Sequence, residues 1–195
     1  MTMTAFPPPS LIPPRAVLSA EAFEVFADLP ENHDKILELI AGEVYEVPSN
    51  AYSSMIASRM SGEIYIFLKN NPLGFITGEA GGYRVATDRY APDVAYVSFA
   101  RQKEPDRRGY NSIAPDLAVE IEDPVTPQSA QRLASKLSRY NTTNTTVWVI
   151  YPETRTVQVH APHQEVKTLA LGDTLDGGEA LPGFTLAVKD IFPPQ

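Results

Sequence analysis

The 195-residue sequence contains no cysteine and only three histidines. Without cysteine the chain can form no disulfide bond, no thiolate metal site and no thiol nucleophile. It also lacks long apolar runs, since the longest are Ile64–Leu68 and Val147–Tyr151, whereas a membrane helix needs roughly 18 residues. The segment before Arg15 has no basic residue and no apolar core of a signal peptide. We therefore expect a cytoplasmic protein that does not contact a membrane.

Positive charge is scarce as well. The chain has 16 Lys and Arg residues against 24 Asp and Glu residues, which gives a formal net charge of −8. This balance opposes non-specific binding of nucleic acid, because phosphate neutralisation by cations supplies most of that affinity. It does not oppose a metal site, since clustered carboxylates are the ligands that hard cations prefer. Hydrophobic residues make up 43% and charged residues 21%, a balance typical of one globular domain.

Proline marks the expected domain boundaries. Of 18 prolines, five precede Arg15 and two lie at 193 and 194. Because proline fixes φ and lacks an N–H group, the first stretch favours an extended arm. We therefore expect a proline-rich arm at residues 1–18, a folded domain at 19–192 and a short tail at 193–195.

The distribution of apolar residues predicts an α/β domain with a mixed sheet. Helices are expected from Ser19 to before Pro30, over 52–69 and over 128–140, because apolar residues recur there at helical spacing. A hairpin is expected around Ala41 and Gly42. Further strands are expected over 74–78, 83–86, 92–98, 117–122, 147–151 and 156–160, and around 181–188.

Three carboxylates occur on or beside expected strands. Glu120 and Glu122 share one strand face, because side chains alternate between faces, and Asp93 opens a second strand. Acids at the ends of adjacent strands can converge on Mg²⁺ or Mn²⁺. The alternative is that Glu120 and Glu122 occupy the solvated face of a half-exposed strand.

The expected helix over 128–140 carries a stripe of cations, Arg132, Lys136 and Arg139, beside an apolar stripe that includes Leu133 and Tyr140. Lys136 therefore borders the buried side of the helix. A lysine in this position can cover apolar surface with its stem and hold its ammonium group over the strand ends. The alternative is an ordinary solvated basic face.

Five segments, in this order and spacing, resemble a known family. They are ELIAGEVYEVP (38–48), RYAPDVAYVS (89–98), APDLAVEIEDP (114–124), KLSRY (136–140) and VWVIYP (147–152). Over residues 35–192 the chain resembles the restriction-endonuclease-like family of the PD-(D/E)XK nuclease superfamily. The resemblance implies a mixed central β-sheet flanked by helices, an α+β arrangement to which this chain adds an N-terminal helix and hairpin. It also implies Mg²⁺-dependent hydrolysis of phosphodiester bonds in DNA, with Mn²⁺ as a substitute, and a homodimer.

The resemblance assigns roles to individual residues. Asp93 matches the aspartate of the PD pair, Glu120 matches the acid of the (D/E)XK element, and Lys136 matches a lysine that many members carry on the following helix. Glu122 stands where the lysine of that element usually lies, and we expect it to act as a third ligand. Glu43 matches a glutamate of the early hairpin and is a further candidate ligand. In such a site the carboxylates hold the metal, and the lysine orients water or offsets charge.

A basic loop is the candidate substrate contact. It contains Arg101, Lys103, Arg107 and Arg108, which could bind phosphates; an ordinary solvated loop is the alternative.

Two other functions remain open at this level. One is a catalytically impaired nuclease fold that acts as a dimeric binding or structural module. It is favoured by Glu122 and by Ser53, which stands where the family often has histidine. The other is a metal-dependent hydrolase of a smaller phosphate substrate, which suits an acidic protein better.

Overall fold

The computed structural model describes residues 17–47 and 50–194. The expected proline-rich arm therefore lies almost wholly outside the described residues, and the domain boundaries stay a prediction. Within these two stretches, no helix is both long enough and apolar enough to cross a membrane.

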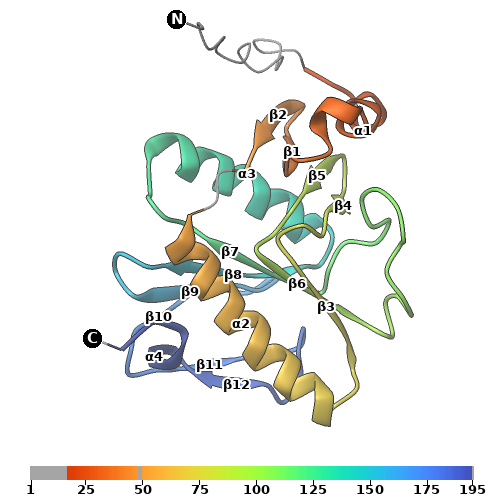
Figure 1. Cartoon of the computed structure of the whole chain (residues 1–195). Coiled ribbons are helices and arrows are strands. Elements are labelled where there is room, and N and C mark those ends of the chain that lie inside the picture. Colours follow the sequence, from red (N-terminus) through yellow and green to blue (C-terminus); the bar gives the residue numbers. More distant parts are fainter. Residues whose placement is uncertain (1–16, 48–49, 195) are drawn as a thin grey trace, which may run out of the picture.

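A six-stranded mixed sheet forms the centre of the fold (Figure 1). Its strands, in spatial order, are β10 (Lys167–Leu169), β9 (Thr156–His160), β8 (Thr146–Tyr151), β7 (Leu117–Ile121), β6 (Val94–Ser98) and β3 (Gly74–Gly78). The neighbours β7 and β8 are parallel, and the other neighbours are antiparallel. The parallel pair needs a crossover connection, which α3 (Pro127–Thr142) provides.

The two long helices lie on opposite faces of this sheet. In Figure 1, α2 (Ala51–Asn70) crosses in front of the strands, and α3 lies behind the hairpin at the top of the view. Ile56, Met60 and Ile64 of α2 are fully buried in one hydrophobic cluster with Val119 of β7. Leu133 of α3 packs in a second cluster on the other face. The expected mixed sheet flanked by helices is thus confirmed.

A second, four-stranded antiparallel sheet lies on the α3 side. Its strand order is β2 (Glu43–Glu46), β1 (Leu37–Ile40), β5 (Asp88–Tyr90) and β4 (Tyr83–Val85). The expected hairpin corresponds to β1 and β2. The two strands pair over their whole length, with Leu37 opposite Glu46 at one end and Ile40 opposite Glu43 at the other. The expected first helix is α1 (Ala20–Ala27), where the Ser19 hydroxyl accepts a hydrogen bond from Ala22 N (3.2 Å) as a helix N-cap does.

Several short elements were not expected from the sequence. They are η1 (Pro30–Asn32), β5, β10, β11 (Thr174–Asp176) and α4 (Val188–Ile191), while β12 (Thr185–Ala187) falls within the strand region expected near the end. The sequence does not predict β5, because Asp-Arg-Tyr shows no alternation of apolar and polar residues, although all three residues are buried. The charged side chains of β5 are buried together with polar partners, and a search for periodic apolar residues does not detect such a strand.

Candidate active site

The end of β7 brings an acidic side chain under α3. Ala118 and Glu120 lie on the α3 face of the sheet, whereas Val119 and Ile121 pack on the α2 face. This is the alternation that the strand predicts. Glu120 is only 6% exposed, so the alternative of a solvated strand face is wrong for this residue. A carboxylate at this depth requires polar partners.

Lys136 supplies the first partner of Glu120. Its Nζ atom donates hydrogen bonds to Glu120 Oε2 (2.6 Å) and to Glu38 Oε1 (2.9 Å). The side chain is buried beside Leu133 and Tyr140, the other buried residues of α3. A firm helix start helps to fix it, since Thr126 and Ser129 form a reciprocal capping box ahead of this stretch. Lys136 therefore does not lie on a solvated basic face.

Glu38 is the acidic residue that the sequence analysis missed. It lies on β1, is 5% exposed, and its Oε1 atom also accepts a hydrogen bond from Ala91 N (2.8 Å). Ala91 directly precedes the Pro92–Asp93 pair, so Glu38 connects Lys136 to the segment that carries Asp93. One signal could have identified it. Glu38 is the single charged residue in the buried strand Leu37–Ile40, where an acid is costly unless it has a partner.

Tyr140 supplies the second partner of Glu120. Its hydroxyl donates a hydrogen bond to Glu120 Oε1 (2.9 Å), and its ring packs edge-on against Tyr90 with centroids 5.1 Å apart. Burial raises the pKa of Tyr140 well above its ordinary value, and the carboxylates of Glu120 and Glu38 act in the same direction. The hydroxyl therefore remains protonated and remains a donor.

Asp93 directly precedes β6, next to the end of β7. Its Oδ2 atom accepts a hydrogen bond from Ile121 N (2.7 Å), and its Oδ1 atom has no hydrogen bond to any part of the chain that the structure describes. Burial raises the pKa of Asp93 to about 6, although the Ile121 N–H and the Lys136 ammonium act in the opposite direction. Asp93 is thus a partly buried carboxyl group with one unused oxygen.

The remaining two expected ligands lie differently. Glu122 is one residue beyond β7 and half-buried; burial raises the pKa of its carboxyl group. Glu43 is exposed, and its Oε2 atom accepts a hydrogen bond from Tyr45 (2.6 Å). The glutamate of the hairpin that contacts Lys136 is Glu38 on β1, and not Glu43 on β2.

The cluster carries an excess of negative charge. Burial raises the pKa of Glu120, although the Lys136 ammonium beside it lowers the pKa. The carboxylates of Glu38 and Asp93 also raise the pKa of Glu120. Burial by itself lowers the pKa of Lys136, but its two carboxylate partners outweigh burial and raise the pKa above the ordinary value. Lys136 is therefore an ammonium group, and three carboxyl groups surround it.

These residues fit Mg²⁺ better than a metal held entirely by protein ligands. Across residues 17–47 and 50–194, no three Asp, Glu or His side chains are grouped so that they alone could hold a metal. Mg²⁺ does not need such a group, because it usually binds one or two carboxylates and completes its shell with water and substrate phosphate. Asp93 and Glu120 provide such a pair at adjacent strand ends. When all three carboxyl groups are ionised, the charges of Asp93, Glu120, Glu38 and Lys136 sum to −2, which a divalent cation offsets.

Arg101 lies at the other end of β7. Its guanidinium group donates hydrogen bonds to the backbone oxygens of Ala114 (3.1 Å), Pro115 (2.8 Å) and Asn144 (3.2 Å). Its Nε atom lies 3.0 Å from Asp116 Oδ1. These contacts occupy the guanidinium group at the end of β7 away from Glu120.

The other loop cations are exposed, and one of them borders a cleft near the site. Lys103, Arg107 and Arg108 are all exposed. Arg108 lines a cleft of about 1060 Å³, which is also lined by Leu37 and Ala91. Leu37 precedes Glu38, and the backbone of Ala91 donates to Glu38. The cleft therefore adjoins the backbone that positions the buried cluster.

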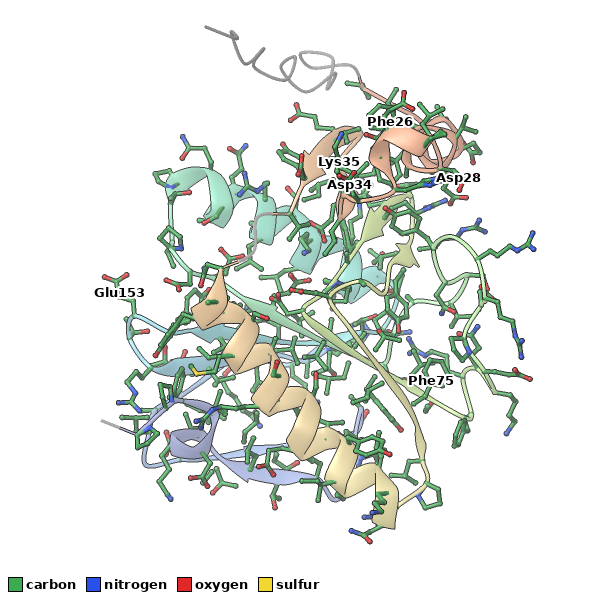
Figure 2. All side chains as sticks on the ribbon, viewed as in Figure 1. Phe26, Asp28, Asp34, Lys35, Phe75 and Glu153 are labelled. Carbon is green, nitrogen blue, oxygen red and sulfur yellow. The ribbon has the colours of Figure 1, made fainter. Side chains whose placement is uncertain are left out.

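Part of the lining of this cleft comes from α1 and the segment that follows it. Asp28, Asp34 and Lys35, which Figure 2 labels beside α1, belong to this part. Lys35 donates a hydrogen bond to Asn32 Oδ1 (2.8 Å). This part of the lining therefore mixes acidic and basic side chains.

Comparisons with known proteins agree with this architecture. The model of the Uma2 family, described as "Putative restriction endonuclease", matches residues 23–189. The chain is also similar to a crystal structure of "a putative nuclease belonging to DUF820" from Anabaena variabilis ATCC 29413, with a TM-score of 0.74 and 22% sequence identity. The alignment covers 90% of this chain and 97% of that chain, and at this identity it shows the fold alone. No curated protein matches the chain.

Proposed function

Because this chain belongs to the Uma2 family, whose model is described as "Putative restriction endonuclease", we propose that it is a metal-dependent DNA endonuclease. One observation carries the proposal. Lys136 is buried between Glu120 (2.6 Å) and Glu38 (2.9 Å), beside the partly open carboxyl group of Asp93. A buried ion pair with surplus negative charge is costly for folding alone, which supports a functional reason for keeping it.

Asp93 and Glu120 are the proposed ligands of Mg²⁺, for which Mn²⁺ can substitute. The bound metal supplies Lewis-acid polarisation of a phosphate oxygen and lowers the pKa of a bound water. Lys136 acts as an ammonium group that offsets the charge developing on the phosphate. Glu38 holds that ammonium group in place through its second hydrogen bond. The chain needs no side-chain nucleophile for this reaction, which suits a protein without cysteine.

The exposed part of the basic loop is the proposed contact with DNA. Arg108 is the best-supported residue, because it lines the cleft whose wall includes Leu37 and Ala91, the neighbours of the cluster in the chain and in the hydrogen-bond network. Lys103 and Arg107 lie in the same exposed loop and would contribute to the same phosphate contacts. Arg101 was expected among them, but its guanidinium group is occupied by backbone oxygens and Asp116. We therefore leave it outside the proposed substrate surface.

The role of Glu122 separates an active from an impaired site. If Glu122 is a third ligand, Glu122→Gln should reduce the rise in melting temperature that Mn²⁺ causes, because metal binding stabilises the fold by mass action. If Glu122 only replaces a lost lysine, Glu122→Lys should increase cleavage and leave the metal-induced shift unchanged. We propose the ligand role, since Lys136 already supplies a cation. The Glu122 side chain would have to turn toward Asp93 and Glu120, because no three acidic side chains of the described residues are grouped to hold a metal as they stand.

Purified protein incubated with supercoiled plasmid DNA tests the proposal. We expect nicked or linear product with Mg²⁺ or Mn²⁺, no product with EDTA, and no product from Asp93→Ala with any metal. A folded chain that binds Mn²⁺ but cleaves neither duplex nor single-stranded DNA would instead support the impaired binding module. Cleavage that persists in EDTA would contradict the proposal.

The homodimer is proposed on the family resemblance and is tested by light scattering. Tyr65 and Ile66 of α2 are apolar side chains exposed by 62% and 58%, and their replacement by charged residues should dissociate a dimer that uses this face. The cytoplasmic location stays a prediction.

A further inference from the structure

Tyr140 links the hydrophobic core to the proposed site without reaching solvent. Its side chain is 0% exposed, so it cannot touch a DNA substrate. The ring belongs to the same hydrophobic cluster as Leu133 and Val149, and it packs against Tyr90. Its hydroxyl has one hydrogen-bond partner within the described chain, Glu120 Oε1 at 2.9 Å. Any effect of this hydroxyl on the reaction therefore acts through Glu120.

The carboxylate of Glu120 has a different partner on each oxygen. Oε2 accepts from Lys136 Nζ (2.6 Å), and Oε1 accepts from the Tyr140 hydroxyl. The last torsion of a glutamate is soft and allows the carboxylate plane to turn. With Lys136 alone, the plane could rotate and exchange its oxygens. With a donor on each oxygen, the plane is fixed.

We propose that Tyr140 is a positioning residue whose hydroxyl holds the Glu120 carboxylate in one orientation for a divalent cation. A carboxylate offers about four lone-pair directions, and Lys136 and Tyr140 together occupy two of them. The other two stay available in a defined direction. Hydrogen bonds of this kind to metal-binding carboxylates typically change metal affinity or activity by about 10- to 100-fold. This inference rests on the proposed function, in which Glu120 is a ligand.

Tyr83 provides a matched control within the same hydrophobic cluster. It is 1% exposed, and its hydroxyl lies 2.8 Å from Thr77 Oγ1. Tyr83→Phe therefore removes a buried, hydrogen-bonded hydroxyl without changing any contact of Glu120. Tyr140→Phe removes the corresponding hydroxyl and leaves its ring against Tyr90. The two variants differ in whether the lost hydroxyl bonds Glu120.

The experiment compares the two variants in plasmid cleavage and in Mn²⁺ binding by calorimetry. For Tyr140→Phe we expect kcat to fall by about 10- to 100-fold and the Mn²⁺ dissociation constant to rise about 10-fold. The KM for plasmid should be unchanged, because a buried side chain makes no substrate contact. Tyr83→Phe should match the wild-type chain in all three quantities. A Tyr140→Phe protein with wild-type kcat and Mn²⁺ affinity would overturn the inference.

Three further outcomes are decisive. If the wild-type chain binds Mn²⁺ but cleaves no DNA, the proposed function fails and calorimetry alone decides: weaker binding by Tyr140→Phe supports the inference, and equal binding overturns it. If the wild-type chain binds no Mn²⁺, both fail. Should Tyr140→Phe not fold, the double variant Glu120→Gln/Tyr140→Phe separates the causes. Restored folding indicates that the hydroxyl acts on the Glu120 charge, whereas continued failure indicates a packing role and overturns the inference.

Discussion

The two ends of β7 each place an acid beside a cation, but the two arrangements differ in how their charges balance. At the start of the strand, Asp116 pairs with Arg101, whose remaining donors bind backbone oxygens. Asp116 Oδ2 accepts from Ser98 N (2.7 Å), so one positive and one negative charge are satisfied together. At the end of the strand, Lys136 is shared by Glu120 and Glu38. A pair that is neutral and fully bonded serves the fold, whereas the cluster with surplus negative charge can accept a cation.

The largest expected difference between the two ends is in cleavage. Glu120→Ala should reduce metal-dependent plasmid cleavage by at least about 10³-fold, because it removes a proposed ligand of the metal that would stabilise the transition state. Asp116→Ala should retain cleavage after correction for the folded fraction. Steady-state kinetics and circular dichroism of both variants measure this. Equal loss of cleavage in two folded variants would remove the functional distinction between the ends.

A second difference should appear in stability and its response to metal. Lys136→Met leaves Glu38 and Glu120 without their cation, and breaking a buried pair in this way costs about 3–5 kcal/mol. Arg101→Met should cost about 1–3 kcal/mol, since it leaves backbone acceptors and Asp116 unpaired. Urea unfolding with and without Mn²⁺ checks both values. We expect Mn²⁺ to recover part of the loss in Lys136→Met and none of it in Arg101→Met.

A third expectation concerns pH. The pKa of Asp93 is raised to about 6 by burial, so the folded state holds this proton more tightly than the unfolded state does. The stability that follows is fully present below about pH 4 and is lost as the pH rises through 6, by about 3 kcal/mol. Asp93→Asn should remove this part of the pH dependence in metal-free protein and should be more stable than wild type at pH 8. Thermal melts between pH 4 and 8 in EDTA measure it. Identical pH profiles of the two proteins would rule out a raised pKa at Asp93.

The smallest effect is expected in substrate binding. Arg108→Ala should weaken DNA binding a few-fold and lower the slope of log affinity against log salt by about 1, because it removes one proposed phosphate contact. Its effect on kcat should be small. Fluorescence anisotropy over a range of salt concentrations, in Ca²⁺ or EDTA, checks this. An unchanged salt slope would place the phosphate contacts elsewhere.

The sequence predicts the positions of Glu120 and Lys136 better than it predicts the position of Glu38. Strand alternation placed Glu120 under the helix that follows, and helical spacing placed Lys136 beside its buried side. Because α3 follows β7 directly in the chain, the periodicities of this strand and this helix are enough to predict that Glu120 and Lys136 lie close together. Glu38 could not be placed in the same way, because β1 belongs to another sheet and lies 98 positions from Lys136 in the chain. No periodic pattern encodes that docking.

Tyr140 was missed for a different reason. Its spacing with Leu133 and Leu137 indicates an apolar stripe, and the ring does pack in the core. The hydroxyl at its end carries the contact with Glu120, which a classification by hydrophobicity does not reveal. The short strand β5 was missed because its charged residues are buried by pairing rather than by an apolar pattern.

Because Glu38 lies on the smaller sheet, the cluster around Lys136 is complete only when the two sheets are docked. Glu120 lies on the larger sheet, Asp93 directly precedes strand β6 of that sheet, and Lys136 lies on α3. Glu38 reaches Lys136 only when the smaller sheet is docked. A contact between residues so far apart in the chain closes late, after local structure has formed. A nascent or partly folded chain therefore lacks the assembled centre. The proposed nuclease activity would therefore belong to the fully folded molecule alone.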